Sequence, residues 1–320
     1  MIGAPLLNTA NLSVGYDAKP VFEGLNLELR SGKFTCFMGP NGIGKSTLIR
    51  TLAGLQRPLS GTVSTTDPAR QPAVVLTDRI AAGYMTVRQL VTFGRYPFLS
   101  WNLKLDKADA DAIESAIERL NLQSLASRRL HELSDGQIQL AQIARVLAQE
   151  TTIILLDEPT AHLDLNNRLE ITLLLRQLAH EGKAVVMATH ELDLALQTAD
   201  EVWLAGSPKG ILTGAPEDLV LQGAFDEIFR LKGFDLLTGK VLHNISRKLT
   251  VSIHGDHPAA LWTRNALDRC GYLIQSDHGD RTISLSLHDN GEVEWIIDDS
   301  DRHNSIESLL SALQHIEQSR

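Results

Sequence analysis

Short apolar runs separated by glycine and asparagine mark the first fifty residues of the chain. The alternating run LSVGY (12–16) and the segment VFEGLNLELRSGK (21–33) predict antiparallel strands. They lead into FTCFMG (34–39), whose mainly apolar character indicates a buried strand. Helical spacing begins shortly afterwards in KSTLIRTLAGL (45–55), and the predicted helix ends at Gly54.

The middle of the chain alternates helical patterns with buried strands. Helical spacing covers 86–97, after a threonine cap, and 106–122, where the first turn is acidic. The apolar runs TIILLD (152–157) and AVVMATH (184–190) predict buried strands, and RLEITLLLRQLAHEG (168–182) predicts the helix between them. Strands that alternate with helices in this way form a mostly parallel sheet, so the predicted fold class is α/β.

From about residue 240 the pattern changes to that of a small α+β unit. A strand, a helix, a hairpin around Asn290-Gly291 and a final helix follow one another. We therefore predict two domains, residues 1–238 and residues 239–320.

Composition narrows the functional classes. The chain has 320 residues and a formal net charge of −9, which argues against nucleic acid as the main partner. Its two cysteines, Cys36 and Cys270, suggest neither a disulfide framework nor a zinc site, and their scarcity fits a reducing cytosol. The first residues lack the features of a signal peptide, and the longest apolar runs are far shorter than the ~20 residues of a spanning helix. We expect a soluble protein that reaches a membrane only through a partner.

A glycine-rich loop joins the predicted buried strand to the first helix. Its sequence, GPNGIGKS, fits G-x-x-x-x-G-K-[ST], and the flanking strand and helix are the context that this pattern requires. Glycines let backbone N–H groups converge on phosphate oxygens, and the helix N-terminus adds a favourable dipole. We expect Lys45 to reach the β- and γ-phosphates of ATP and Ser46 to bind Mg²⁺; the alternative is a glycine-rich turn beside an exposed lysine. The predicted nucleotide-binding residues here are Gly39, Pro40, Asn41, Gly42, Ile43, Gly44, Lys45, Ser46 and Thr47.

Acidic residues follow one predicted strand and a histidine ends another. In TIILLDEPT, Asp157 is placed to hold Mg²⁺, and Glu158 could polarise the attacking water as a general base. Such a pair can also be a charge pair at a helix N-terminus or a turn. A lone histidine is usually structural, but His190 ends AVVMATH on the same face as the phosphates, where an imidazole could bond the γ-phosphate or order the water.

In this order, the motifs resemble those of the nucleotide-binding subunit of ABC transporters over roughly residues 8–235. GPNGIGKST resembles the Walker A motif, LSDGQ (133–137) the signature, TIILLDEPT Walker B, and His190 the H-loop. AHLD, which ends at Asp164, is similar to the D-loop, and Tyr16 matches the aromatic position whose ring stacks on adenine. A tyrosine of a core strand is the other interpretation of Tyr16.

The resemblance implies a head-to-tail dimer with a second copy of the chain, in which LSDGQ completes the other copy's ATP site. Ser134, Gly136 and Gln137 then lie at the start of a helix and face the γ-phosphate. Asp135 replaces the first glycine of the usual LSGGQ. We expect its side chain to cap the helix through the Ile138 N–H, with the carboxylate pointing away from phosphate.

A second departure concerns the Q-loop, where the family carries glutamine and this chain has Asp78. A carboxylate can still accept a hydrogen bond from a Mg²⁺-bound water, so Asp78 is a candidate metal-site residue; position 77 or 79 is possible instead. A helical subdomain is expected over about 79–150.

The subtype is indicated by MTVRQLVTFGRYPFLSW (85–101), which is similar to the matching region of importers for ferric siderophores, haem and cobalamin. This implies a transmembrane permease, a periplasmic substrate-binding protein acting through it, and a place on the cytoplasmic face of the inner membrane. Tyr96, Phe98 and Trp101 either contact the permease or pack the helical subdomain.

Two questions stay open at this stage. A non-transport ABC ATPase with soluble partners, or the ATPase of an exporter, would carry the same motifs. In the C-terminal segment, His254 and His257 in HGDH invite metal sensing, but no spacing typical of a metal site is present, so chance clustering on a solvated face is the preferred explanation. A regulatory or dimer-contact role is expected there by analogy only.

Overall fold

The computed structural model divides into two compact units, residues 1–230 and 231–320, each described here by itself. The division falls after Arg230, whereas the change in sequence pattern places it after residue 238. The structure describes residues 4–68, 70–77, 84–99, 104–207, 210–230, 232–236, 239–241, 247–255, 257–275, 278–288 and 291–319.

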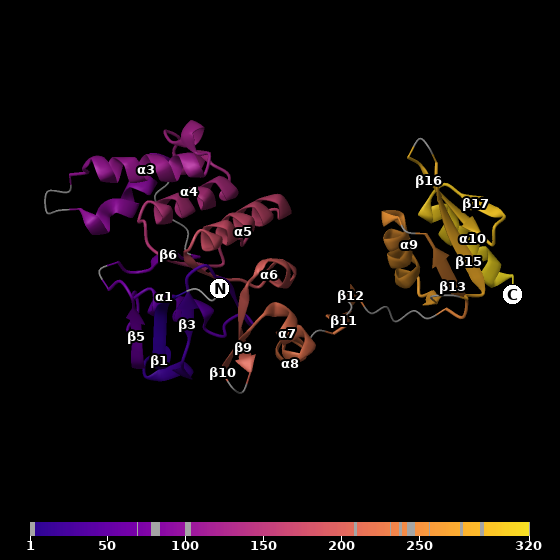
Figure 1. Ribbon diagram of the computed structural model, residues 1–320, viewed down its shortest axis with the longest axis horizontal. Helices are drawn as coiled ribbons and strands as arrows, with labels where there is room; N and C mark the ends of the chain where they lie inside the picture. The colour runs from indigo at the N-terminus through magenta and orange to yellow at the C-terminus, as the bar shows by residue number, and fades with distance from the viewer. Residues whose placement is uncertain are drawn as a thin grey trace. The chain divides into compact units, whose positions relative to one another are not determined.

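Two sheets form the framework of the first unit (Figure 1). The antiparallel sheet has the order β2-β1-β3, and β5 also pairs with β1. The six-stranded sheet has the order β10-β9-β4-β8-β7-β6 and is parallel except for β10. The strands are β1 (Pro5–Tyr16), β2 (Lys19–Leu25), β3 (Glu28–Arg30), β4 (Phe34–Met38), β5 (Ser60–Thr65), β6 (Ala73–Val75), β7 (Ile153–Asp157), β8 (Ala184–Ala188), β9 (Glu201–Ser207) and β10 (Gly210–Gly214). The predicted mostly parallel sheet with an antiparallel subdomain is confirmed.

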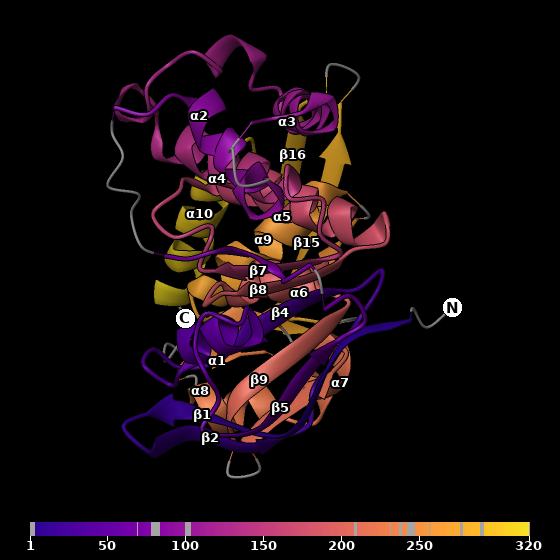
Figure 2. The same ribbon diagram turned by 90° about the vertical axis from the view of Figure 1, so that its left-hand side faces the viewer.

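Helix α1 (Lys45–Leu52) packs between the two sheets, and α5 (Leu165–His180) and α6 (Leu192–Thr198) pack on the parallel sheet (Figures 1 and 2). Every residue of β4, β7 and β8 is buried, because helices or strands cover both faces of the sheet. This burial explains why these strands are apolar throughout rather than alternating. Two short helices, α7 (Pro216–Leu221) and α8 (Ala224–Phe229), end the unit.

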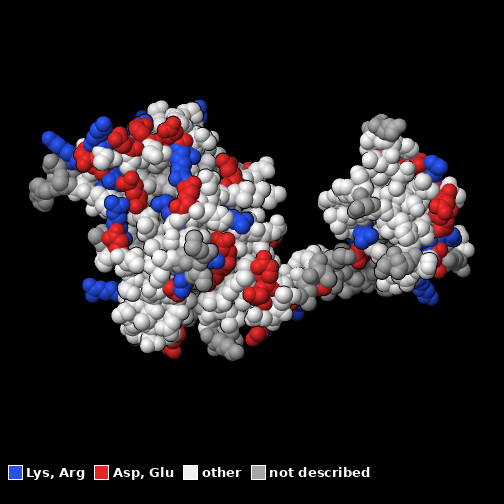
Figure 3. Space-filling view, viewed as in Figure 1, with Lys and Arg blue, Asp and Glu red and all other residues white. Residues whose placement is uncertain are grey.

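The helical region follows β6. It contains α2 (Val87–Thr92), the 3₁₀ helix η1 (Phe93–Phe98), α3 (Lys107–Arg119), the 3₁₀ turns η2 (Gln123–Leu125) and η3 (Leu130–Glu132), and α4 (Asp135–Leu147). Thr86 caps α2 as expected, but the predicted helix over 86–97 changes to 3₁₀ after Thr92. A side chain at Gly94 would lie 2.2 Å from the Arg145 carbonyl, so η1 needs glycine to approach α4. On the face drawn in Figure 3, basic and acidic residues are interspersed over this region.

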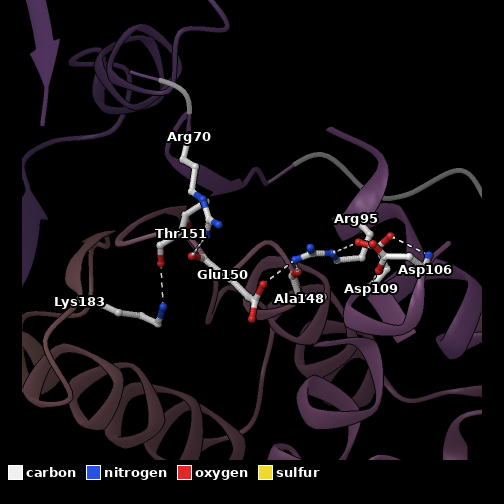
Figure 4. A network of polar contacts seen from close by, with 8 residues as sticks. All are labelled: Arg70, Arg95, Asp106, Asp109, Ala148, Glu150, Thr151 and Lys183. Carbon is white, nitrogen blue, oxygen red and sulfur yellow. Dashed lines mark hydrogen bonds and ion pairs between the residues drawn. The ribbon is translucent and has the colours of Figure 1, made fainter. Parts of the chain in front are cut away.

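A group of polar contacts around the buried Arg95 and Asp109, called here the Arg95 cluster, joins η1 and α3 to the end of α4 (Figure 4). Arg95 donates from Nε to Asp109 Oδ1 (2.8 Å), and from Nη1 to the Ala148 carbonyl (2.8 Å) and Glu150 Oε2 (2.8 Å). Asp106 caps α3 and exchanges hydrogen bonds with Asp109. The remaining members extend the network to the ends of the parallel strands: Arg70, Thr151 and Lys183.

The second unit contains a small hairpin and a five-stranded sheet of order β14-β13-β15-β16-β17. β13 pairs in parallel with β14 and β15, and the β15–β16 pair is the antiparallel hairpin predicted from the sequence. Two helices pack on the sheet over a core that includes Trp295, whose Nε1 donates to Thr263 Oγ1 (2.7 Å). The elements are β11 (Phe234–Asp235), β12 (Lys240–Val241), β13 (Thr250–His254), α9 (Pro258–Arg269), β14 (Leu273–Gln275), β15 (Arg281–Leu287), β16 (Val293–Ile297), β17 (Asp301–His303) and α10 (Ile306–Gln318).

The two histidines of HGDH have different surroundings. His257 caps α9 by accepting a hydrogen bond at Nδ1 from the Ala259 N–H (3.1 Å), and His254 is exposed at the end of β13. Within the ranges that the structure describes, no group of three or more His, Cys, Asp or Glu side chains is arranged to hold a metal ion.

Candidate nucleotide site

The glycine-rich loop lies between β4 and α1, at the carboxyl end of the parallel sheet. Gly39, Gly42 and Gly44 all have positive φ values, of 153°, 79° and 106°. A side chain at Gly44 would meet Val21 Cγ1 at 2.1 Å, and one at Gly39 would meet the Ala205 carbonyl at 2.9 Å. The loop therefore needs glycine both for its backbone conformation and for its close approach to neighbouring strands.

Lys45 begins α1 and is 5% exposed. Its Nζ donates to the carbonyls of Gly39 (2.9 Å) and Pro40 (3.4 Å), so the ammonium lies within the curve of the loop. Burial lowers the pKa of Lys45, and the nearby carboxylates of Glu158 and Asp157 oppose that shift. The two carboxylates thus act on the same lysine that the loop encloses.

Asp157 and Glu158 end β7 and differ in their surroundings. Asp157 is 3% exposed, and its Oδ1 is buried with no hydrogen-bond partner among the described residues. The Asp157 carbonyl accepts from Thr77 Oγ1 (2.9 Å). Glu158 adopts a left-handed backbone (φ 51°), a strained conformation for this residue, and its N–H donates to the Ala188 carbonyl. His190 Nδ1 lies 3.7 Å from Glu158 Oε1. We call Glu158 and His190 the Glu158–His190 pair.

The residues fit magnesium and ATP. A buried carboxylate oxygen without a donor is costly unless a cation or a donor reaches it, and the Asp157 Oδ1 is such an atom. Ser46, which follows Lys45 in α1, is exposed and offers a second oxygen ligand. Tyr16 is 52% exposed, unlike a core tyrosine, and its hydroxyl lies 3.4 Å from Thr47 Oγ1. An exposed ring beside the phosphate loop is suited to stacking on a base.

The signature segment begins α4. Ser134 is the N-cap: its Oγ accepts from the Gln137 N–H (3.3 Å), and Gln137 Oε1 accepts from the Ser134 N–H (3.1 Å). The expectation that Asp135 caps the helix through Ile138 is wrong. The Ile138 N–H donates to the Ser134 carbonyl. Asp135 is instead the first helical residue, where its negative charge interacts favourably with the helix dipole.

The D-loop segment ends in a second cap. Asp164 caps α5 by accepting from the Asn167 N–H (2.9 Å) and from Asn167 Nδ2 (2.9 Å). His162, just before it, has a left-handed backbone (φ 66°). Both carboxylate oxygens of Asp164 are therefore used within this chain, whereas the resemblance assigned it to nucleotide binding. A cavity between the start of α4 and this segment is lined in part by Asp135, Asp157, Glu158 and His162.

Two of the predicted positions, Asp78 and Trp101, lie outside the described residues. Of the other aromatic residues, Tyr96 is 46% exposed and lies against Phe93, with ring centroids 4.4 Å apart. Phe98 is half-buried between the guanidinium groups of Arg95 (4.8 Å) and Arg70 (5.5 Å). The exposure of Tyr96 agrees with the interpretation of a ring available to a partner, and the packing of Phe98 agrees with the interpretation of a ring that packs the helical subdomain.

Sequence reasoning missed the residues that connect the motifs. Asn167 and Arg168 in α5 and the buried Glu191 contact the signature, the D-loop and the turn of His190, as described below. Only Glu191 had a local signal, because it directly follows a predicted site residue.

The comparisons with known proteins agree with this geometry. The family described as "ABC transporter" matches residues 22–161, and the family described as "Iron ABC transporter C-terminal domain" matches residues 247–314. An uncharacterised ABC transporter ATP-binding protein of Methanocaldococcus jannaschii is 40% identical over 238 residues, covering 71% of this chain and 82% of that protein. The chain belongs to the ATP-binding proteins of ABC transporters, which are ATPases coupled to transport.

Relatives with named cargo are similarly close. The iron(3+)-hydroxamate import ATP-binding protein of Bacillus subtilis is 38% identical over 236 residues (70% of this chain, 88% of that protein). The ferric enterobactin transport ATP-binding protein of Escherichia coli is 35% identical over 237 residues (71% and 88%). Among solved structures, a metal-chelate type ABC transporter in an inward-facing conformation matches with a TM-score of 0.65 and 31% identity, over 71% of this chain and 90% of that one.

Proposed function

We propose that this chain is the ATP-hydrolysing subunit of an importer whose cargo is an iron complex, with a siderophore or haem, or cobalamin. The observation that carries the proposal is the occurrence on one chain of the phosphate loop with its adjoining carboxylates and of a segment, 247–314, that matches the iron ABC transporter C-terminal domain. The names of the relatives from Bacillus subtilis and Escherichia coli support iron complexes over cobalamin.

The residues of the site have separable roles. The backbone N–H groups of the glycine-rich loop and the Lys45 ammonium bind the phosphates, and Tyr16 stacks on adenine. Ser46 and Asp157 hold Mg²⁺, which neutralises charge on the phosphates when bound. Glu158 takes a proton from the attacking water, and His190 beside it orients that water.

A second copy of the chain supplies the rest of the site. Ser134 Oγ accepts one hydrogen bond in the cap, which leaves its O–H free to donate to a γ-phosphate held by the other copy. The Gly136 N–H points from the first turn of α4 and adds the helix dipole. This arrangement makes hydrolysis depend on closure of the dimer.

An apolar groove between β6 and the helical region fits a helix of the permease. It is lined mainly by apolar side chains, and exposed Phe93 and Tyr96 lie on it. The lining residues are Leu55, Val74, Leu76, Met85, Leu90, Phe93, Tyr96, Pro97, Gln142, Arg145 and Gln149. In the part of the chain that the structure describes, no helix is long and apolar enough to cross a membrane. Binding through this groove would hold the chain at the cytoplasmic face of the membrane, below a permease that receives cargo from a periplasmic binding protein.

Three experiments test the proposal. The purified full-length chain should release phosphate from ATP in the presence of Mg²⁺ and lose this activity with EDTA. Affinity purification of the tagged chain from gently solubilised membranes of its source should recover a many-helix permease. That complex, reconstituted in vesicles, should take up a ⁵⁵Fe-labelled siderophore or haem in an ATP-dependent manner. Recovery of soluble partners alone would favour the non-transport ATPase, and ATP-driven movement of substrate in the opposite direction would favour the exporter.

A further inference from the structure

The first turn of α5 contacts three segments of the site that are far apart in sequence. It follows the D-loop, and its side chains reach both the signature turn and the turn that carries His190. The α5 residues that make these contacts, Asn167 and Arg168, lie outside the motifs predicted from the sequence.

Asn167 makes the contact with the signature turn. Its amide is held by Asp164, which accepts from both its backbone N–H and its side-chain Nδ2. A Cβ built on Gly136 would lie 3.0 Å from Asn167 Cγ and 3.1 Å from Nδ2, so the amide lies directly against the glycine. The Asn167 side chain, which Asp164 holds in place, therefore fixes the position of the signature turn at the start of α4.

Arg168 makes the contact with the other two segments. Its Nε donates to the Leu163 carbonyl of the D-loop (2.6 Å), and its Nη1 lies 3.5 Å from Glu191 Oε1. Glu191 is 8% exposed, its Oε2 has no hydrogen-bond partner among the described residues, and it directly follows His190. Burial raises the pKa of Glu191, and Arg168 opposes that shift.

We propose that the first turn of α5 is the common support of the Glu158–His190 pair and the signature turn, with Arg168 and Asn167 as its positioning residues. The inference rests on the proposed roles of Glu158 and His190. Without Arg168, the buried Glu191 carboxylate loses its nearest counter-charge, and the turn that aims His190 at Glu158 is free to shift. Neither positioning residue touches the reacting atoms.

The first test separates positioning from binding at Arg168. Binding of a fluorescent ATP analogue is measured in the Glu158→Gln background, where hydrolysis is blocked, and kcat is measured in the otherwise wild-type protein. We expect Arg168→Ala to lower kcat on the order of 10- to 100-fold, the scale for small misplacements in an active site. ATP affinity should stay within about twofold, because no Arg168 contact faces the phosphate loop. Arg168→Lys should recover part of the rate, and Arg176→Ala, two turns further along α5, is the matched control.

A double-mutant cycle tests the path through Glu191. Glu191→Gln keeps the shape of the side chain, so the pair Arg168→Ala and Glu191→Gln should be clearly non-additive in kcat if they act through one contact. Additive effects, an unchanged kcat in Arg168→Ala, or equal losses in kcat and ATP affinity would overturn the role of Arg168. An inactive wild-type chain, or a fully active Glu158→Gln variant, would instead overturn the proposed function.

The second test concerns Asn167. In the Glu158→Gln background, Asn167→Ala should weaken ATP-driven dimerisation about tenfold, because the signature turn loses its support while the phosphate loop is untouched. Sedimentation at several protein concentrations measures this, with Asn166→Ala as the exposed neighbouring control. Dimerisation equal to that of the control variant would exclude Asn167 as a positioning residue.

Discussion

The Arg95 cluster and the nucleotide site both bury charged side chains in the first unit, but their polar atoms are satisfied to different degrees. Arg95 has donors engaged by Asp109, Glu150 and a carbonyl, within one network (Figure 4). In the nucleotide site, one oxygen of Asp157 and one of Glu191 are buried without a hydrogen-bond partner among the described residues. Left-handed backbone at Glu158 and His162 adds strain there.

The difference separates charges that are satisfied within the fold from a charge, the Asp157 carboxylate, whose surroundings fit a cation. A network whose charges are all paired and hydrogen-bonded offsets part of the free energy lost when they leave water, whereas an incomplete one offsets less. We therefore expect substitutions in the Arg95 cluster to change stability and substitutions in the nucleotide site to change activity.

The largest expected effect is on stability. Arg95→Met should lower the free energy of unfolding by about 3 to 5 kcal/mol, because it leaves the buried Asp109 carboxylate without its counter-charge. Urea denaturation measures the loss, and ATP affinity of the protein that remains folded should not change. A loss below about 1 kcal/mol, as for an exposed pair, would contradict the structural role of the cluster.

The second effect is on activity. Glu158→Gln should bind ATP but turn over at least ~100-fold more slowly, since that is the usual scale for loss of a general base. Its free energy of unfolding should be close to that of wild type. Glu181→Gln, which removes an exposed carboxylate paired with Arg119, is the control and should hydrolyse ATP normally.

A third, smaller effect would sharpen the contrast. Asp157→Asn should abolish hydrolysis and yet raise the free energy of unfolding by about 1 kcal/mol, because it removes a buried, incompletely bonded charge. The measurement is thermal or urea unfolding in the absence of nucleotide. Destabilisation similar to that of Arg95→Met would show that Asp157 belongs to the fold rather than to the ligand.

The last effect is on acid stability. The Asp106 N–H and the Arg95 guanidinium hold the pKa of Asp109 below its usual range. A depressed carboxyl pKa stabilises the folded protein above the unfolded-state pKa, near 3.8, and this contribution is lost as the pH falls through the folded-state value. Unfolding free energy measured below about pH 4 should therefore fall less steeply in Asp109→Asn than in wild type. Equal slopes would contradict this assignment.

The sequence predicted those parts of the molecule that depend on local pattern. The glycine-rich loop, the strand of Asp157 and the strand of His190 were found because each is a continuous run with its own signal. The sequence predicts a cap at Asp135 because an acidic residue in the first turn of a helix and an N-cap residue have similar sequence signatures. In the structure, the extended backbone and side-chain hydrogen bond of Ser134 identify it as the N-cap. Arg95, Asn167 and Arg168 could not be found, since their partners are distant in the chain and an arginine or asparagine in a helix carries no local sign of a tertiary contact.

The cap at the start of α4 has a consequence for how such sequences are interpreted across evolution. Ser134 and Gln137 bond each other reciprocally within one chain, and such a cap stabilises a helix by about 1 kcal/mol. A duplicated gene that had lost hydrolysis would still be selected to keep both residues for folding. Retention of S-x-x-Q in a degenerate copy is therefore weak evidence of enzymatic competence. Retention of Gly136, which lies between Ser134 and Gln137 and against Asn167, is better evidence that the site still assembles.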